Sequence, residues 1–255
     1  MSVGSSSNAK AAVSLGFDRV TDLAITSGMP IKAISATEWL GGAIDAPSIV
    51  SIATKGNRRR GIAGDLDVNT IIGTFIGSIR TAGTLSGEWN CNNIKSISAL
   101  NITSAAFVLD QEPNAKVLAL RGLTAKRHIT DSQIISDGNI GTINAGAMIN
   151  SLCFAGIKGG VIGLPDPAVD INVLASIKII TVKGLKGEPN AFINCNIAAA
   201  TITSATLNYP QSNNGGTPFG LSADFIKSLK IKNAGGATTL KNRSSPSDSN
   251  DFDDF

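Results

Sequence analysis

The chain has few charged and few aromatic residues for its length, and this scarcity excludes several classes of protein. Of the 255 residues, 16% are charged and 5% are aromatic, while 42% are hydrophobic. This balance excludes intrinsic disorder for the bulk of the chain, because disorder requires low hydrophobicity and high charge. A long coiled coil is excluded too, since it needs many charged residues and few glycines, and 27 glycines are present.

Cysteine and long hydrophobic runs are also scarce. Cys91, Cys153 and Cys195 are too few and too widely spaced for a disulfide scaffold, and they fit small buried side chains. One disulfide plus a free thiol is the alternative. No run of ~18 apolar residues occurs, so no transmembrane segment is expected. The first ten residues lack the charged and apolar regions of a secretory signal.

A short aliphatic motif recurs along the chain. It consists of an aliphatic residue, two small or polar residues, a second aliphatic residue and a small residue. Copies begin at Ile31, Ile49, Ile76, Ile94, Ile140 and Ile149, with looser copies at Ile177 and Ile226. Longer echoes join Glu38-Trp39 to Glu88-Trp89 and Asn90-Cys91-Asn92 to Asn194-Cys195-Asn196. Repeats of ~20 residues are typical of a solenoid, in which each repeat forms one coil.

The composition of each repeat favours short strands. β-Branched residues dominate, and Gly, Asn and Pro interrupt them every few residues. We therefore predict an all-β, single-stranded parallel β-helix of about ten short coils, right-handed by the general preference of parallel crossovers. Trp and Tyr are expected to fit poorly inside it. Short helices of one or two turns are expected at 10–15 and 222–228. An antiparallel sandwich or barrel is the alternative, but only Asp137-Gly138 and Asn214-Gly215 suggest hairpins.

The glycine-rich repeats are similar to a known kind of sequence. Ile76-Gly-Ser-Ile-Arg-Thr-Ala-Gly-Thr-Leu-Ser-Gly87 resembles the β-helical repeat segments of very large bacterial surface or secreted proteins. The stretch from Pro218 to Ile231 resembles the end of such a segment. The resemblance covers most of residues 20–240. It implies an extracellular or cell-surface location within a larger parent protein, and it supplies no catalytic residues.

The pattern divides the chain into three parts. Residues 1–19 are predicted to form a cap or linker, 20–240 the solenoid, and 241–255 a polar acidic tail. Three stretches interrupt the repeat and are expected to project as loops, at 55–67, 159–170 and 208–219. Insertions in repeat folds often lie on one face and carry binding residues.

Residues for catalysis are few. The single His128 has no neighbouring nucleophile motif, and one His with three scattered Cys gives no zinc pattern, so no cofactor or metal is predicted. Hydrolysis of a polysaccharide needs two carboxylates across one bond. The best candidates are Asp65 and Asp67, with Arg60 nearby, and the alternative is a charged turn beside a strand. Asp166 and Asp170 form a second acidic pair.

Two features suggest binding. Arg58, Arg59 and Arg60 could hold a phosphate, a sulfated glycan or an acidic segment such as 248–254, or they could form a solvated corner. If Trp39 and Trp89 point outward on one face, they form an aromatic shelf for a sugar ring. If they point inward, they only pack. The Asn residues around Cys91 and Cys195 could stack as an internal ladder.

These observations predict a non-catalytic structural, display or adhesive β-solenoid that belongs to a larger surface or secreted protein. End-to-end association of copies is an open possibility, because the ends of a solenoid carry unpaired strands. The alternative is a β-helix that binds or cleaves polysaccharide. No nucleic-acid partner is predicted, since the net charge is only +3 and there is one Tyr.

Overall fold

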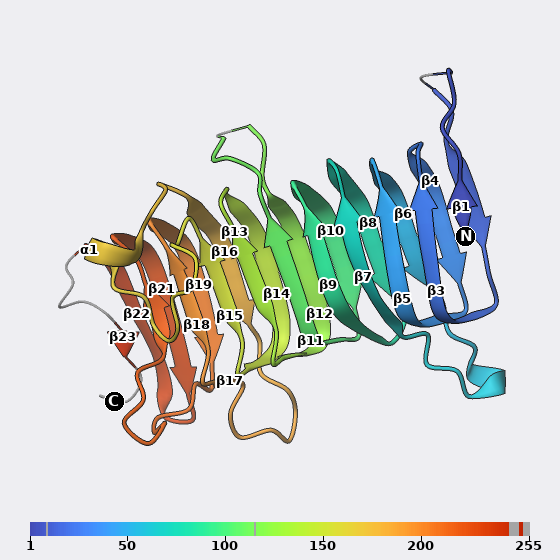
Figure 1. The fold of residues 1–255 in the computed structure, drawn as a ribbon. Helices are drawn as coiled ribbons and strands as arrows, with labels where there is room; N and C mark the ends of the chain where they lie inside the picture. The colour runs from blue at the N-terminus through green and yellow to red at the C-terminus, as the bar shows by residue number, and fades with distance from the viewer. Residues whose placement is uncertain (9, 115, 245–249, 252–255) are drawn as a thin grey trace.

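The computed structural model describes residues 1–8, 10–114, 116–244 and 250–251. It is an all-β structure in which parallel strands stack side by side and the sheet curls on itself like a solenoid (Figure 1). The chain runs from the blue N-terminal strands at one end of the stack to the red strands at the other. The predicted stack of parallel strands is confirmed at this level.

One series of strands, here called ladder A, forms one side of the stack. Each strand pairs in parallel with the next member, except that the last, β22, is antiparallel to β21. Its members are β2 (Val13–Gly16), β4 (Ile31–Ala36), β6 (Ile49–Thr54), β8 (Phe75–Thr81), β10 (Asn93–Ala99), β12 (Leu120–Thr130), β14 (Ile140–Ile149), β16 (Ser176–Val182), β19 (Thr201–Asn208), β21 (Phe225–Asn233) and β22 (Gly236–Arg243).

A second series, ladder B, follows the other side. Its members are β1 (Ser2–Val3), β3 (Arg19–Ser27), β5 (Glu38–Ala46), β7 (Leu66–Ile72), β9 (Thr84–Cys91), β11 (Asn101–Leu109), β13 (Gln133–Ser136), β15 (Leu152–Ala155), β18 (Asn196–Ala199), β20 (Gly220–Ser222) and β23 (Asn250–Asp251). The final pair, β20 with β23, is antiparallel. The C-terminal end of β12 pairs with β11 of ladder B, which links the two ladders. The C-terminal end of β14 pairs with the short strand β17 (Phe192–Ile193).

The predicted motif sets the register of ladder A. Ile31 pairs with Ile49, and Ile49 pairs with Ile76. The same buried column continues through Ile94, Leu120, Ile140, Ile177, Ile202 and Ile226. Burying an aliphatic side chain of this size contributes roughly 1.5–3 kcal/mol, so this column is a main source of stability. The copy at Ile149 is different, because Leu152 pairs with Asn196 in ladder B.

The two short helices expected at 10–15 and 222–228 are absent from the described structure. Val13–Gly16 is strand β2, and the second position holds the end of β20 at Ser222 and the start of β21 from Phe225. A single helical turn leaves most of its backbone groups unpaired, whereas strand pairing satisfies them along the neighbouring coil. The described helices instead lie on loops that project from the stack, η1 at Arg58–Arg60 and α1 at Pro167–Asp170.

Strands form both ends of the stack. β1 and β2 pair with β3 and β4, so part of the expected cap at 1–19 belongs to the parallel ladders. At the other end β22 and β23 occupy the outer edges of β21 and β20 with reversed direction. Most of the expected acidic tail, 245–249 and 252–255, lies outside the described residues. Among the helices that are described, none is long and apolar enough to cross a membrane.

Candidate functional site

The two tryptophans proposed as a sugar shelf lie inside the solenoid. Trp39 and Trp89 are both 0% exposed, so neither indole can stack on a ligand. Trp39 packs edge-on against Phe17, and Trp89 stacks on Phe107 with ring centroids 6.3 Å apart. The Trp89 Nε1–H donates to the carbonyl oxygen of Ser86 at 3.1 Å. The shelf prediction is therefore wrong, and so is the expectation that Trp fits poorly in the interior.

The three consecutive arginines form helix η1 on a projecting loop. Asn57 caps this helix by accepting a hydrogen bond from the Arg60 backbone N–H. The Arg60 guanidinium is 2.8 Å from the Asp18 carboxylate, and hydrogen bonds from Arg60 and then Thr37 hold the pKa of Asp18 below its ordinary value. Arg58 and Arg59 stay exposed. Binding at this corner stays a prediction, and the acidic segment 248–254 proposed to face it is largely outside the described residues.

The predicted carboxylates do not form one site with Arg60. Asp65 lies just before β7, and its Oδ1 accepts the Thr84 backbone N–H at 2.6 Å, which ties two coils together. Asp67 lies on β7 beside a shallow depression of about 560 Å³ that Asn69 and Glu88 also line. Arg60 binds Asp18 rather than either of these carboxylates.

The second acidic pair has a local structural role. Asp166 caps α1 by accepting the Ala168 backbone N–H, and Asp170 accepts the Asp166 backbone N–H. Both carboxylates therefore hold the projecting loop in shape. Among the described residues, no group of three His, Cys, Asp or Glu side chains gathers to hold a metal ion.

The cysteines and the histidine serve the fold. All three cysteines are free and buried, so the prediction of small buried side chains is confirmed and the disulfide alternative is wrong. Burial raises the pKa of Cys91 and Cys195 to about 12 and that of Cys153 still further. His128 Nε2 lies 3.0 Å from Glu188 Oε1, a pair that holds the loop between β16 and β17 against β12.

A depression on ladder A has a markedly basic lining. It measures about 460 Å³ and is lined by Lys95, Lys116, Arg121 and Lys178, together with Asn93, Val117 and Leu118. We call it the basic groove. Lys95, Arg121 and Lys178 come from β10, β12 and β16, while Lys116, Val117 and Leu118 belong to the connection between β11 and β12. All four cations are exposed.

The register of the strands explains why these cations gather. Lys95, Arg121 and Lys178 each follow the first aliphatic residue of the motif. Because that aliphatic residue is buried, the next residue along the strand faces solvent. Ile94 pairs with Leu120, so Lys95 lies beside Arg121. Leu120 and Ile177 both pair with Ile140, so Gly141 separates Arg121 from Lys178. We call this line of outward positions the cation column.

Gly141 lies buried beneath the groove, at the position between Arg121 and Lys178. A Cβ at Gly141 would lie 2.2 Å from the Arg121 carbonyl oxygen and 3.1 Å from Leu118 Cδ1, so the strands and the loop close tightly over this position. The Lys116–Leu118 segment stands as a wall, and 40% of the Val117 surface is exposed. The groove thus combines cations along its length with an apolar wall.

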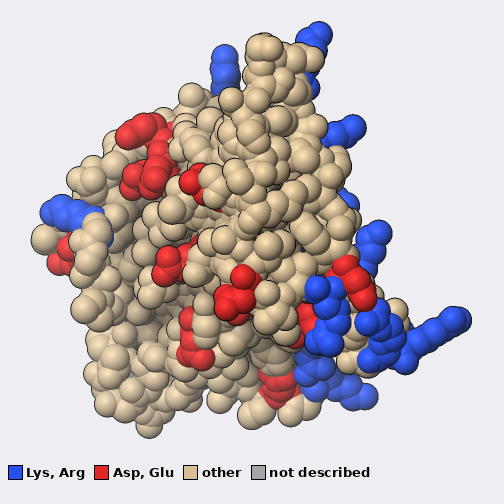
Figure 2. Space-filling view, turned by 45° about the vertical axis from the view of Figure 1, so that its right-hand side comes forward, with Lys and Arg blue, Asp and Glu red and all other residues tan. Residues whose placement is uncertain are grey.

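These four cations have no acidic partner among the described residues. The ion pairs found there join Arg19 to Glu38, Arg60 to Asp18 and His128 to Glu188. Lys95 and Arg121 lie directly side by side, an arrangement of like charges that destabilises a sheet. Figure 2 shows one side of the molecule, where many Lys and Arg lie toward the right-hand edge and Asp and Glu lie both among them and on the adjoining surface. A bound anion would relieve the repulsion in the groove.

Reasoning from the sequence missed this groove, although a signal was present. The motif copies read Ile31-Lys32, Ile94-Lys95, Ile177-Lys178 and Ile226-Lys227, so a cation recurs in the second place. Leu120-Arg121 continues the series, with Leu in place of the Ile that begins the other copies. The recurrence indicates a column only once the register is known.

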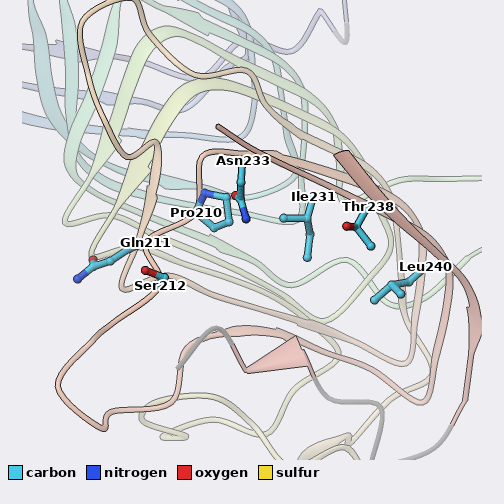
Figure 3. Close-up of a pocket in the computed structure, with 7 residues that line it drawn as sticks. All are labelled: Pro210, Gln211, Ser212, Ile231, Asn233, Thr238 and Leu240. Carbon is cyan, nitrogen blue, oxygen red and sulfur yellow. The ribbon is translucent and has the colours of Figure 1, made fainter. Parts of the chain in front are cut away.

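A separate small cavity lies at the C-terminal end of the stack (Figure 3). It measures about 100 Å³ and lies between the β21–β22 hairpin and the segment after β19. Its lining residues are Pro210, Gln211, Ser212, Ile231, Asn233, Thr238 and Leu240. Ile231 and Leu240 give it a largely apolar character, and the hairpin closes it. Its size and position suit packing under the reversed strand rather than a ligand.

The basic groove is therefore the strongest candidate site in the described chain. When the chain is compared with models of protein families, with curated proteins and with solved structures, none of them matches it.

Proposed function

We propose that this chain is a non-catalytic, adhesive β-solenoid that binds an acidic polysaccharide in the basic groove. In this proposal the two ladders are two faces of one single-stranded, right-handed β-helix with about ten coils. The stack acts as a rigid support that displays the groove at a cell surface or outside the cell. Association of copies end to end would add length to the same support.

The observation that carries the proposal is the group of four unpaired cations around one depression. Lys95, Lys116, Arg121 and Lys178 line the groove within a few strands, and none has an acidic partner in the described part of the chain. Adjacent cations of this kind raise the local concentration of anions and speed their association. Arg121 adds a guanidinium that can bind a carboxylate or sulfate with two hydrogen bonds.

The lining favours a polysaccharide over a single-stranded nucleic acid. Single-stranded nucleic acids are held by aromatic side chains on which bases stack, and no aromatic residue lines the groove. An acidic sugar has instead a charged edge and a C–H face. Val117 and Leu118 give the groove an apolar wall for that face, while the cations meet the acidic groups.

Binding of polygalacturonate tests the proposal, measured by calorimetry at low and high salt, with neutral dextran as the reference. The triple variant K95Q/R121Q/K178Q should lose binding at least tenfold, and its fold should be as stable as before, because like-charge repulsion is removed. The matched control K32Q/R80Q/K230Q changes two Lys and one Arg on the same ladder, all outside the groove lining. It should retain binding within about threefold, the scale of isolated exposed charges.

Two results would contradict the proposal. Wild-type protein that binds neither polygalacturonate nor another acidic polysaccharide at low salt has no such site. Equal losses in the triple variant and in its control would mean that net charge, and not the groove, attracts the polymer.

Cleavage of a polysaccharide is a second candidate, favoured by one observation. Asp67 and Glu88 line the same open depression on ladder B, and two carboxylates are the minimum for glycoside hydrolysis. An assay for new reducing ends with D67N and E88Q tests this candidate. Release of product by the wild type, abolished in both variants, would support it, and no release from a panel of polysaccharides would reject it.

A further inference from the structure

We infer that the polymer lies along the solenoid axis, across the strands, and that it is a linear polyuronate with an acidic group on every ring. This inference rests on the proposed function, since it assigns a direction and a charge spacing to a ligand of the basic groove. Its starting point is the spacing of the cation column.

The column places its cations at multiples of the strand spacing. Lys95 and Arg121 are on adjacent strands, β10 and β12, and are therefore about 5 Å apart along the axis. Arg121 and Lys178 flank the buried position of Gly141, so they are about 10 Å apart along the axis. A ligand that follows the column meets a cation at each of these steps, whereas a ligand that lies along a strand meets only one.

The column continues toward the C-terminal end but stops toward the N-terminal end. Ile177 pairs with Ile202 and Ile202 with Ile226, so Thr203 and then Lys227 extend the line beyond Lys178. On the other side, Gly77 lies next to Lys95 and Val50 follows it. Neither of these two residues is charged, so we place the start of the track at Lys95.

The spacing selects the kind of acidic polymer. In an extended 1,4-linked polyuronate every ring carries a carboxylate and advances by about one strand spacing, ~5 Å. Such a chain can bring a carboxylate level with each of Lys95, Arg121 and Lys178 along the axis. A polymer with a carboxylate on alternate rings has a charge only about every second strand, so it can satisfy the Arg121–Lys178 step but not the Lys95–Arg121 step. The polyuronate should therefore bind more tightly for the same number of charges.

The apolar part of the groove lies on the column itself. Leu118 covers the position of Gly141, and Lys116 and Val117 line the groove with the column cations. A polymer that follows the column would therefore pass over the Leu118 side chain between Arg121 and Lys178.

The experiment adds one cation on the column and one beside it. T203K places a Lys on the next strand of the track, beyond Lys178, while T206K places the same charge on the same strand, three residues away. Both threonines are half-buried, so the two variants are matched. Affinity is measured for oligogalacturonates of increasing length and for hyaluronan oligosaccharides with the same number of carboxylates.

We expect T203K to bind long oligogalacturonates about threefold more tightly, the effect of one added exposed ion pair, with little gain for the shortest ones. T206K should change affinity much less. Wild-type protein should prefer oligogalacturonate over hyaluronan at equal charge. Circular dichroism on both variants checks that each is folded before affinities are compared.

The outcomes separate the inference from the proposed function. If wild-type protein binds no acidic oligosaccharide, the proposed function fails and the inference fails with it. If wild-type protein binds but T203K and T206K are equivalent, the ligand does not follow the column. If hyaluronan binds as well as oligogalacturonate at equal charge, the assigned charge spacing is wrong, while polysaccharide binding itself stands.

Discussion

Gly141 lies so close to Arg121 of the neighbouring strand that a methyl group on its Cα would lie 2.2 Å from the Arg121 carbonyl oxygen. Real Cβ atoms do not approach a backbone atom this closely, so any side chain here must push β14 away from β12. The relationship matters for binding because Arg121 and Leu118, which both lie close to Gly141, line the basic groove.

We therefore expect Gly141→Ala to destabilise the fold by about 1–3 kcal/mol, the usual cost of overpacking, and to weaken binding of polygalacturonate. The matched control is Gly122→Ala, because a Cβ at Gly122 would meet its nearest atom at 4.0 Å. Urea unfolding measures both free energies. Equal stability of the two variants would show that β12 and β14 separate without cost.

The buried position of Trp89 predicts a large effect on stability and none on ligand binding. Its ring stacks on Phe107 and is 0% exposed. Replacing a buried Trp by Ala costs about 3–5 kcal/mol, whereas Trp89→Phe should cost less because it keeps an aromatic ring in the interior. Calorimetric melting gives the stabilities. A Trp89→Ala protein that stays as stable as the wild type but no longer binds sugar would contradict this prediction and support a sugar-binding role for Trp89.

An exposed ladder of amides should stabilise one corner of the solenoid. Asn194 Nδ2 donates to Asn150 Oδ1 at 3.1 Å, and Asn150 Nδ2 donates to Asp131 Oδ1 at the same distance. All three residues have positive φ, between 47° and 49°. The ladder therefore combines side-chain hydrogen bonds with a backbone conformation that Asn and Asp tolerate better than most residues.

Two substitutions at Asn150 separate these contributions. Asn150→Gly keeps the backbone conformation and loses the amide hydrogen bonds, at about 0.5–1.5 kcal/mol each. Asn150→Ala loses the same bonds and adds roughly 1–2 kcal/mol of left-handed strain. Alanine should therefore be the more destabilising change in urea unfolding. The same loss for both would mean that strain at this corner is negligible.

The buried thiols should be unreactive while the protein is folded. Because burial raises the pKa of Cys91 and Cys195 to about 12, almost no thiolate forms at pH 8. A thiol reagent should label no cysteine in native protein and all three after unfolding in urea. Rapid labelling of native protein would contradict the buried positions.

The same shifts predict a loss of stability at alkaline pH. The unfolded thiol has a pKa near 9.0, so between pH 9 and 12 the unfolded chain releases protons that the folded chain retains. Folding stability must then fall as pH rises through this window, and it is unaffected by these groups below it. Cys195→Ala should show a shallower decline than the wild type, measured by urea unfolding at each pH.

The repeat of the sequence predicted more of ladder A than of ladder B. Ile31, Ile49 and Ile76 stack in one column as their spacing indicates, because each copy buries the same side chain. The copy at Ile149 has the same local pattern but lies at a different place in its coil. The motif has two inward-facing aliphatic residues three positions apart, with outward-facing residues between them. This spacing can occur in either ladder, so the motif alone does not identify the ladder.

The longer echoes were less informative. Trp39 pairs with Leu66, whereas Trp89 pairs with Phe107 and Thr70, at another part of ladder B. The two Glu-Trp pairs therefore do not occupy equivalent positions. Whether each ring points inward depends on the coil to which it belongs, and nothing within a few residues of either Trp reports that.

The candidate site shows the same division. Arg58, Arg59 and Arg60 are adjacent in the chain, and the sequence predicts binding there, yet they lie on a solvated loop where Arg60 is paired with Asp18. Lys95, Arg121 and Lys178 are far apart in the chain and gather in one groove. Loops of different lengths separate their coils, so their proximity is a property of the strand register.

The residue pattern alone predicts short, stacked parallel strands with aliphatic columns inside, because periodic burial and β-branched residues act locally in every repeat. Which residues meet depends on the tertiary structure. The lengths of the insertions bring Lys95, Arg121 and Lys178 to the same line, and Gly141 packs closely against Arg121 and Leu118 between them. Hydrogen bonds between strands set this register across many residues, and such long-range pairing is not encoded in any one stretch of the chain.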